Sequence, residues 1–148
     1  TIKPTLIILS GGENLGKYKS RDKLEMFLIN YAIKNKIKLI GICRGMQSIN
    51  KFYGGTLKKV DKHVAKHHYL KIISNEIKIP SRVNSFHKLS IDKLGKNLTI
   101  IARSKNDNQI EAIISNNLNI FGIMWHPERN KNYNSNLLMI KSFIINNK

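Results

Sequence analysis

The order of apolar segments predicts an α/β fold, with a mostly parallel doubly wound sheet and an antiparallel β extension in the C-terminal half. Two short apolar runs, at residues 5–9 and 37–42, have the length and composition of buried strands. Each is followed by a segment of helical periodicity, and a strand–helix–strand–helix order favours parallel pairing with helices on both faces. Later β-type runs, separated only by turns, indicate the antiparallel extension.

The first predicted helix lies between these two strands. Asp22, with Glu25 three residues later, resembles a capping box. Apolar residues then recur at helical spacing, at Leu24, Phe27, Leu28, Tyr31 and Ala32. A second helix is predicted beyond the strand at 37–42, with apolar positions at Met46, Ile49 and Phe52 and an end at Gly54-Gly55.

The remainder of the chain alternates short β-type runs with turn residues. These runs cover residues 57–60, 69–73, 98–102, 110–114 and 120–124. The segment 134–147 has helical periodicity and is predicted to be the last helix. Because neither an internal repeat nor a low-complexity linker interrupts the sequence, we expect residues 1–148 to form one domain.

The composition favours a cytoplasmic enzyme over a nucleic-acid or membrane protein. The net charge is +17, but the lysines are scattered singly and are not interleaved with aromatic residues that could stack on bases. We therefore expect no nucleic-acid partner, whereas an anionic small substrate would suit the same charge. No apolar stretch approaches the roughly 18 residues of a membrane span. The single cysteine rules out an internal disulfide and suits a reducing compartment.

That cysteine lies where the second strand meets its helix, in the sequence Gly41-Ile42-Cys43-Arg44-Gly45. This is the G-x-nucleophile-x-G elbow, in which a tight turn exposes the nucleophile. We expect the helix N-terminus to lower the thiol pKa and the backbone N–H of Arg44 to face a developing oxyanion. The alternative is a buried structural cysteine.

A nucleophilic cysteine needs a base, and the base needs an orienting group. Of the five histidines, His126 alone follows a buried strand directly and precedes Pro127 and Glu128. Proline would fix the turn so that the Glu128 carboxylate reaches the imidazole. The same three residues would also be compatible with an ordinary surface turn.

A second glycine-rich strand end, Ser10-Gly11-Gly12, follows the first predicted strand. Backbone N–H groups without neighbouring Cβ atoms approach a substrate carbonyl easily, so this segment is a candidate for the other half of an oxyanion hole. In a parallel sheet both strand ends lie on the same edge, where α/β enzymes build their sites. The alternative is a tight loop without a catalytic role.

Six motifs together resemble the class I glutamine amidotransferase family and, within it, the stand-alone γ-glutamyl hydrolases of the peptidase C26 group. In chain order they are LSGGEN (9–14), GICRGMQSIN (41–50), GGTL (54–57), VNSFH (83–87), IEAI (110–113) and GIMWHPE (122–128). They cover nearly the whole chain in the order that the family has them.

The resemblance implies a flavodoxin-like fold and a set of site residues. It implies a triad of Cys43, His126 and Glu128, with an oxyanion hole from the amides of Gly12 and Arg44. The residues that it implies for substrate binding are Gly11, Gln47 and the loop Asn84, Ser85, Phe86 and His87. Alternatively, Gln47 is a solvated helix residue and His87 a loop histidine without substrate contact.

The sequence departs from the family pattern in three places. The family's first strand and helix would precede Thr1 and are expected to be missing. The frequent HHQ sequence reads His87-Lys88-Leu89 here, and the loop between Gly12 and Asp22 is shorter than usual. The first of these two differences affects the expected specificity but not the triad, and the shorter loop predicts an altered or more open pocket rim.

The function implied by the resemblance is hydrolysis of a γ-glutamyl amide to glutamate and an amine, without a metal or an organic cofactor. The positive charge suggests an anionic leaving group such as a nucleotide. Two alternatives stay open: a glutaminase subunit that feeds ammonia to a synthetase partner, and a non-enzymatic binding domain on the same fold.

Overall fold

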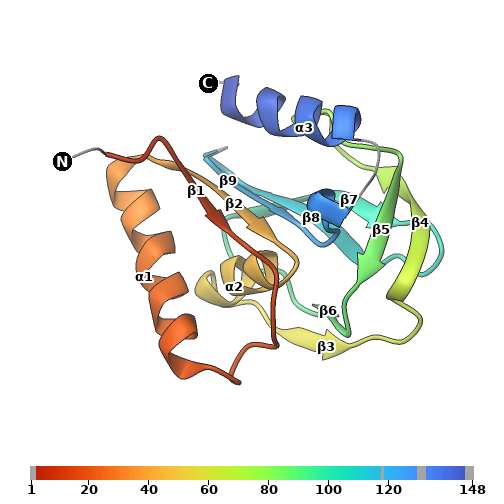
Figure 1. Cartoon of the computed structure of the whole chain (residues 1–148), viewed down its shortest axis with the longest axis horizontal. Helices are drawn as coiled ribbons and strands as arrows, with labels where there is room; N and C mark the ends of the chain where they lie inside the picture. The colour runs from red at the N-terminus through yellow and green to blue at the C-terminus, as the bar shows by residue number, and fades with distance from the viewer. Residues whose placement is uncertain (1–2, 118, 130–132, 146–148) are drawn as a thin grey trace.

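The computed structural model describes residues 3–117, 119–129 and 133–145 and places seven strands in one sheet (Figure 1). Across the sheet the strands are β1 (Leu6–Leu9), β2 (Lys38–Ile42), β9 (Ile120–Ile123), β8 (Ile110–Ser115), β7 (Leu98–Ser104), β4 (Val64–Ile72) and β5 (Arg82–Phe86). A separate pair is formed by β3 (Leu57–Lys59) and β6 (Leu89–Ile91). The helices are α1 (Lys19–Asn35), α2 (Arg44–Phe52) and α3 (Tyr133–Ile145), with a short 3₁₀ helix at Pro127–Arg129.

The pairing divides this sheet into a parallel and an antiparallel half. Strands β1, β2 and β9 are parallel, whereas β9–β8, β8–β7, β7–β4 and β4–β5 are antiparallel. The predicted α/β class and the antiparallel extension are therefore confirmed. The sheet is mixed rather than mostly parallel, because short turns join β7 to β8 and β8 to β9 and so reverse the chain direction.

Helices cover both faces of the sheet, as predicted. On one face, α1 and α2 pack through a core that includes Ile29, Met46 and Ile49. On the other face, α3 packs through a second core, in which the Phe121 and Phe143 rings have centroids 5.4 Å apart. Figure 1 shows α3 on the opposite side of the strands from α1 and α2.

The prediction for α1 was wrong in detail. Its N-cap is Tyr18, without a side-chain hydrogen bond, so Asp22 and Glu25 lie inside the helix and form no capping box. Of the predicted apolar face, Leu24 and Phe27 are 54% and 61% exposed. The helix instead turns Glu25 inward because this carboxylate pairs with the buried guanidinium of Arg44.

Two segments that looked irregular in the sequence are strands. The predicted loop at Asn84–His87 belongs largely to β5, and β4 begins at Val64 rather than at residue 69. Both were missed because polar residues dominate them: His67 and Lys66 are exposed, whereas Asn84 and Ser85 are buried polar residues. The last helix is as predicted up to Ile145, and residues 146 and 147 lie outside the described residues.

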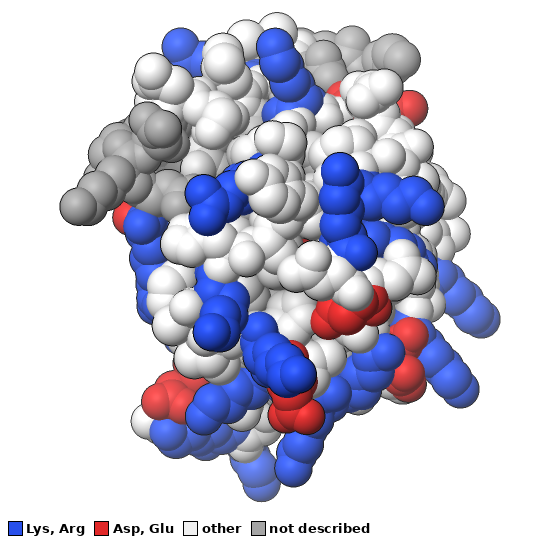
Figure 2. Space-filling model, turned by 90° about the vertical axis from the view of Figure 1, so that its right-hand side faces the viewer, with Lys and Arg blue, Asp and Glu red and all other residues white. Residues whose placement is uncertain are grey.

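Charged side chains on one face of the molecule are spread out. On the face of the molecule seen from the right-hand side of Figure 1, lysines and arginines lie scattered among uncharged residues and a few acidic groups (Figure 2). Among the described residues, no helix has the length and apolar character needed to cross a membrane.

Candidate active site

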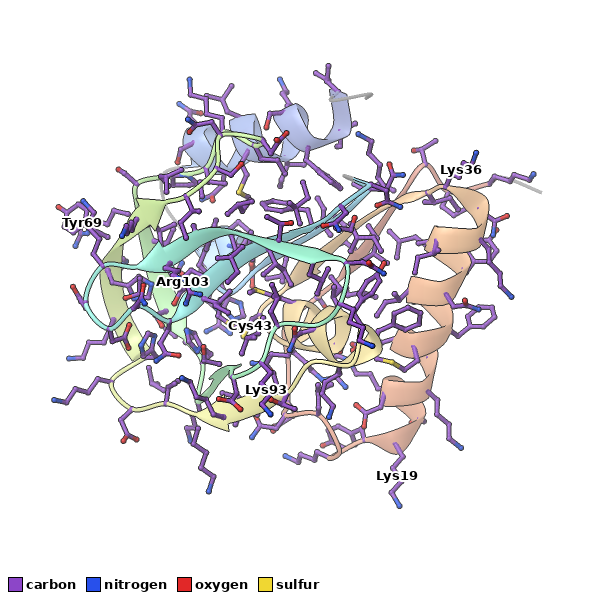
Figure 3. All side chains as sticks on the ribbon, turned by 180° about the vertical axis from the view of Figure 1, so that it is seen from behind. Lys19, Lys36, Cys43, Tyr69, Lys93 and Arg103 are labelled. Carbon is purple, nitrogen blue, oxygen red and sulfur yellow. The ribbon has the colours of Figure 1, made fainter. Side chains whose placement is uncertain are left out.

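The candidate site is built at the carboxyl ends of β1, β2 and β9. Cys43 lies between β2 and α2, near the middle of the molecule (Figure 3). Its backbone is held at φ 50° and ψ −102°, a conformation that costs a non-glycine residue energy. Its N–H donates to the carbonyl of Ile123 on β9, at 2.7 Å. This is the geometry of the predicted elbow.

The two glycines of the elbow are required by close packing. A Cβ atom on Gly45 would overlap the backbone of Leu9 in β1, and one on Gly41 would lie 2.5 Å from the carbonyl carbon of Gly45. Neither neighbour can move without displacing a strand or the start of α2. The glycines therefore let the turn fold tightly between two strands and a helix.

The expected low pKa of the thiol is not found. Burial raises the pKa of Cys43 to about 11, and the hydrogen bond from the Arg44 amide and the charge of Arg129 only partly offset this increase. The helix N-terminus is present, but desolvation of a thiolate in the interior has the larger effect. In the free protein the sulfur is therefore a thiol at neutral pH, and a base must take its proton.

His126 follows β9 and lines the same pocket as Cys43. Its Nδ1 lies 2.6 Å from Glu128 Oε1. Because a carboxylate only accepts, Nδ1 carries the proton and Nε2 is free to act as a base. The Glu128 side chain is 54% exposed, so the orienting hydrogen bond lies at the edge of the site.

Asn84 on β5 fixes the backbone of His126. Its Oδ1 accepts from the His126 N–H and its Nδ2 donates to the His126 carbonyl, both at 2.8 Å. The Phe86 ring meets the imidazole edge-to-face, with centroids 5.9 Å apart. Gly11 also lies so near the imidazole that a Cβ atom on it would be 2.6 Å from Cε1. These residues hold the imidazole in place.

The two predicted oxyanion donors, Gly12 and Arg44, also line the pocket. The Arg21 guanidinium braces the loop before Gly12, since its Nη2 donates to the carbonyls of Ser10 and Gly11, at 3.0 and 2.9 Å. The Gly11 carbonyl and the Gly12 N–H belong to the same trans peptide, in which they point in opposite directions. The bond from Arg21 to the Gly11 carbonyl therefore directs the Gly12 N–H away from Arg21. The Arg44 side chain pairs with Glu25 and Asp22 and leaves only its backbone for the site.

These groups surround a pocket of about 410 Å³. It is lined by Gly12, Glu13, Asn14, Cys43, Arg44, Gln47, Val64, Phe86, His87, Lys88, His126 and Arg129. Of the residues expected to touch substrate, Gln47, Phe86 and His87 line it. Gly11, Asn84 and Ser85 do not, because their contacts are with the His126 ring, the His126 backbone and His63 respectively.

Sequence reasoning missed one cation of the pocket. The Arg129 guanidinium stacks over the Phe86 ring, with its carbon 4.5 Å from the ring centroid. Its position directly after His126-Pro127-Glu128 was the available signal, since the 3₁₀ turn that presents Glu128 also presents Arg129. Together with Lys88, it adds two positive groups to a pocket lining that also includes the carboxylate of Glu13, while Glu128 lies beside Arg129 at the edge of the site.

Comparison with known proteins finds relatives that are enzymes by name. The chain is 38% identical to the γ-glutamyl-CDP-amidate hydrolase of Campylobacter jejuni subsp. jejuni serotype O:2, over 93% of this chain and 68% of that protein. It is 31% identical to a glutamine-hydrolysing GMP synthase subunit of Pyrococcus abyssi, over 86% and 68% of the two chains. It thus spans about two thirds of the length of these relatives.

The fold has counterparts among solved structures. A glutamine amidotransferase from Thermotoga maritima superposes with a TM-score of 0.73 and 19% identity, over 93% of this chain and 70% of that one. The family model of Peptidase C26 matches residues 1–128, a stretch that contains the proposed triad and both predicted oxyanion donors. The chain therefore belongs to the Peptidase C26 family.

Proposed function

We propose that the protein hydrolyses a γ-glutamyl amide through a γ-glutamyl thioester on Cys43. The observation that carries this proposal is the shared pocket of Cys43 and His126, with Nδ1 of His126 bonded to Glu128, in a member of the Peptidase C26 family. The arrangement supplies a nucleophile, a base and an orienting group, the combination that acyl transfer requires.

The first half of the reaction forms the thioester. As Cys43 Sγ attacks the γ-carbonyl carbon, Nε2 of His126 takes the thiol proton, which the raised pKa of Cys43 keeps in place until then. The carbonyl oxygen becomes an oxyanion and accepts from the N–H groups of Gly12 and Arg44. Losing one such donor typically lowers the rate by about 100-fold or more.

The second half releases both products. The imidazolium of His126 gives its proton to the departing amine as the C–N bond breaks. His126 then takes a proton from water, whose oxygen attacks the thioester carbonyl, and it returns this proton to Cys43 Sγ as the C–S bond breaks and glutamate leaves. Every bond in these steps is made by the chain, the substrate and water.

We further propose an anionic, phosphate-bearing leaving group. Arg129 and Lys88 lie on the pocket rim, and the whole chain carries a net charge of +17. The Campylobacter relative is by name a hydrolase of γ-glutamyl-CDP-amidate, which has such a group. Gln47 and Phe86 would then contact the γ-glutamyl half. A reducing cytoplasm would keep Cys43 as a thiol.

The test is glutamate release from three substrates: γ-glutamyl-CDP-amidate, glutamine and an uncharged γ-glutamyl amide. We expect the nucleotide substrate to have the highest kcat/KM and Cys43→Ala to be inactive on all three. Full activity of Cys43→Ala would refute the mechanism. A preference for the uncharged amide would refute the proposal of an anionic leaving group and would leave the thioester mechanism intact.

The second candidate is a glutaminase that serves as one component of an amidotransferase. It is favoured by the 31% identity to the Pyrococcus GMP synthase component. In that case glutamine would be the best of the three substrates, and its turnover by the isolated chain would be slow. Fast turnover of γ-glutamyl-CDP-amidate by the isolated chain would exclude this candidate.

A further inference from the structure

A second buried polar cluster lies in the antiparallel half of the sheet and takes no part in the proposed reaction. Glu111 on β8 is fully buried, and His63, His68 and His87 surround it. Its Oε1 lies 3.2 Å from His68 Nε2, 3.6 Å from His87 Nε2 and 3.8 Å from His63 Nδ1. Each imidazole is at most 6% exposed.

A β-bulge brings these histidines together. His63 and His68 are five residues apart, so in a regular strand their side chains would point to opposite faces. Pairing with β5 skips Ala65, because Val64 pairs with Phe86 and Lys66 with Ser85. The skipped residue, at φ 53°, shifts the alternation of side chains by one position. Both imidazoles therefore point toward Glu111. Such a conformation costs a non-glycine residue about 1 kcal/mol or more and often marks a functional site.

Several facing atoms of the cluster lack a hydrogen bond of good geometry. His87 Nδ1 donates to the Leu89 carbonyl at 3.0 Å, so its Nε2 is the ring nitrogen that faces the carboxylate. Both oxygens of Glu111, Nε2 of His68 and Nε2 of His87 are buried without a hydrogen-bond partner. The neighbours of the Glu111 carboxylate are the imidazole nitrogens at 3.2–3.8 Å, and a cation between these atoms would bind the carboxylate and the imidazole lone pairs together.

His63 has the contacts expected of a metal ligand. Its Nε2 lies 2.6 Å from the carboxylate of Asp107, which fixes the ring proton on that side. Nδ1 faces the cluster, and the neighbouring Ser85 hydroxyl gives its proton to the His63 carbonyl, at 2.7 Å. Metal-binding histidines typically donate their second N–H to a carboxylate or a backbone carbonyl, as His63 and His87 both do.

The spacing fits a small tetrahedral ion. With Zn–N and Zn–O distances near 2.0–2.1 Å, neighbouring ligand atoms of a tetrahedral site lie about 3.3 Å apart. The three distances from Glu111 Oε1 are 3.2–3.8 Å, and donor atoms of His63, His68 and Glu111 all lie within 4.8 Å of one another. A pocket of about 380 Å³, lined by His63, His68 and Asp107 among others, leads to the cluster.

We propose that His63, His68, His87 and Glu111 bind one divalent transition-metal ion of the Zn²⁺ type. Imidazole nitrogen with one carboxylate is a ligand set that suits zinc. The three clustered donors and His87 beside them all come from the protein, so the ion is structural and joins β4, the end of β5 and β8 without entering the thioester chemistry.

The test uses chelator-treated protein titrated with Zn²⁺ and, as a spectroscopic probe, Co²⁺. Cys43 and His126 could bind the same ions, so Cys43→Ala is the reference protein. Glu111→Gln and His68→Ala remove ligands from the cluster, and His67→Ala, which changes an exposed histidine next to it, is the matched control. The readouts are metal stoichiometry, the visible spectrum of Co²⁺ and Tm.

We expect Cys43→Ala to bind one equivalent and to give a tetrahedral Co²⁺ spectrum. At Zn²⁺ concentrations 100 times Kd, its Tm should rise by about 5–10 °C. Adding His67→Ala to this background should leave binding unchanged, whereas adding Glu111→Gln or His68→Ala should abolish the site. Absence of saturable binding by Cys43→Ala would overturn the proposal, even if the cluster variants fail to fold. Undiminished binding by the Glu111→Gln variant would overturn it too.

Discussion

The parallel half of the sheet builds the proposed active site and the antiparallel half the proposed metal site, and the two halves assemble these sites differently. In the parallel half, Cys43, His126 and Gly12 follow the ends of three strands, where the topology alone brings them to one edge. In the antiparallel half, His63, His68 and Glu111 meet only because of strand register and a bulge at Ala65. The first group can be predicted from contiguous sequence motifs, whereas the second depends on pairing between distant segments.

The largest expected effect is a loss of activity on substitution in the parallel half of the sheet, with no loss at an exposed position in the antiparallel half. His126→Ala should lower kcat by about 10²–10⁴-fold, because it removes the general base while leaving the thiol in place. Glutamate release by the variant gives the measurement, and His67→Ala, at an exposed position on β4, should match wild type. A loss of less than about tenfold would show that another group is the base.

The next prediction concerns the pH dependence of the thiol. Since burial raises the pKa of Cys43 to about 11, alkylation by iodoacetamide should accelerate about tenfold per pH unit from pH 7 and level off near pH 11. The folded state holds this proton more tightly than the unfolded chain, whose thiol pKa is near 8.5. The contribution of the Cys43 proton to the free energy of unfolding is therefore complete below about pH 8.5 and is lost as the pH rises toward 11. A rate already constant between pH 7 and 9 would contradict the raised pKa.

A smaller effect tests the link between the halves. Asn84 reaches from β5 to the backbone of His126 with two hydrogen bonds of 2.8 Å. Asn84→Ala should destabilise the protein by about 1–3 kcal/mol and lower kcat roughly tenfold, because the base loses its position. Thermal melts and glutamate release measure both. Asn84→Asp, which keeps an acceptor for the His126 N–H, should be less impaired in kcat than Asn84→Ala, and equal losses would argue against this role.

The smallest effect concerns the leaving group. Arg129 is exposed on the pocket rim, so its attraction for an anion is screened and is worth about 1 kcal/mol or less. Arg129→Gln should raise KM for γ-glutamyl-CDP-amidate about two- to fivefold and leave KM for glutamine unchanged. Lys34→Gln, an equal loss of charge on the far part of α1, is the control. An equal change with both substrates would assign Arg129 to the glutamyl half.

The sequence was sufficient for the parallel half of the fold because its signals are local. Apolar runs predicted β1, β2 and β9, and the glycines at 41 and 45 predicted a turn whose close contacts the structure reproduces. The direction of the Cys43 pKa could not be read in this way. It depends on how completely α2 and the neighbouring strands exclude water, which is a property of packing.

The antiparallel half was harder to predict because polar residues fill its interior. Asn84 and Ser85 were expected to bind substrate in a loop, yet they lie buried in β5 and hold His126 and His63. Glu25 looked like a helix cap and is instead the buried partner of Arg44. In each case a distant partner decides the position of the polar residue, and periodicity within one segment carries no information about it.

Cys43 as the nucleophile is the central claim, and the single cysteine of the chain allows a direct measurement. Wild-type protein is alkylated with iodoacetamide in steps, and intact mass and glutamate release are recorded on the same samples. If Cys43 is the nucleophile, we expect activity to fall in proportion to alkylation and to reach zero at one adduct per chain. A γ-glutamyl substrate should protect the enzyme from this loss. Fully alkylated protein that still releases glutamate would contradict this role of Cys43.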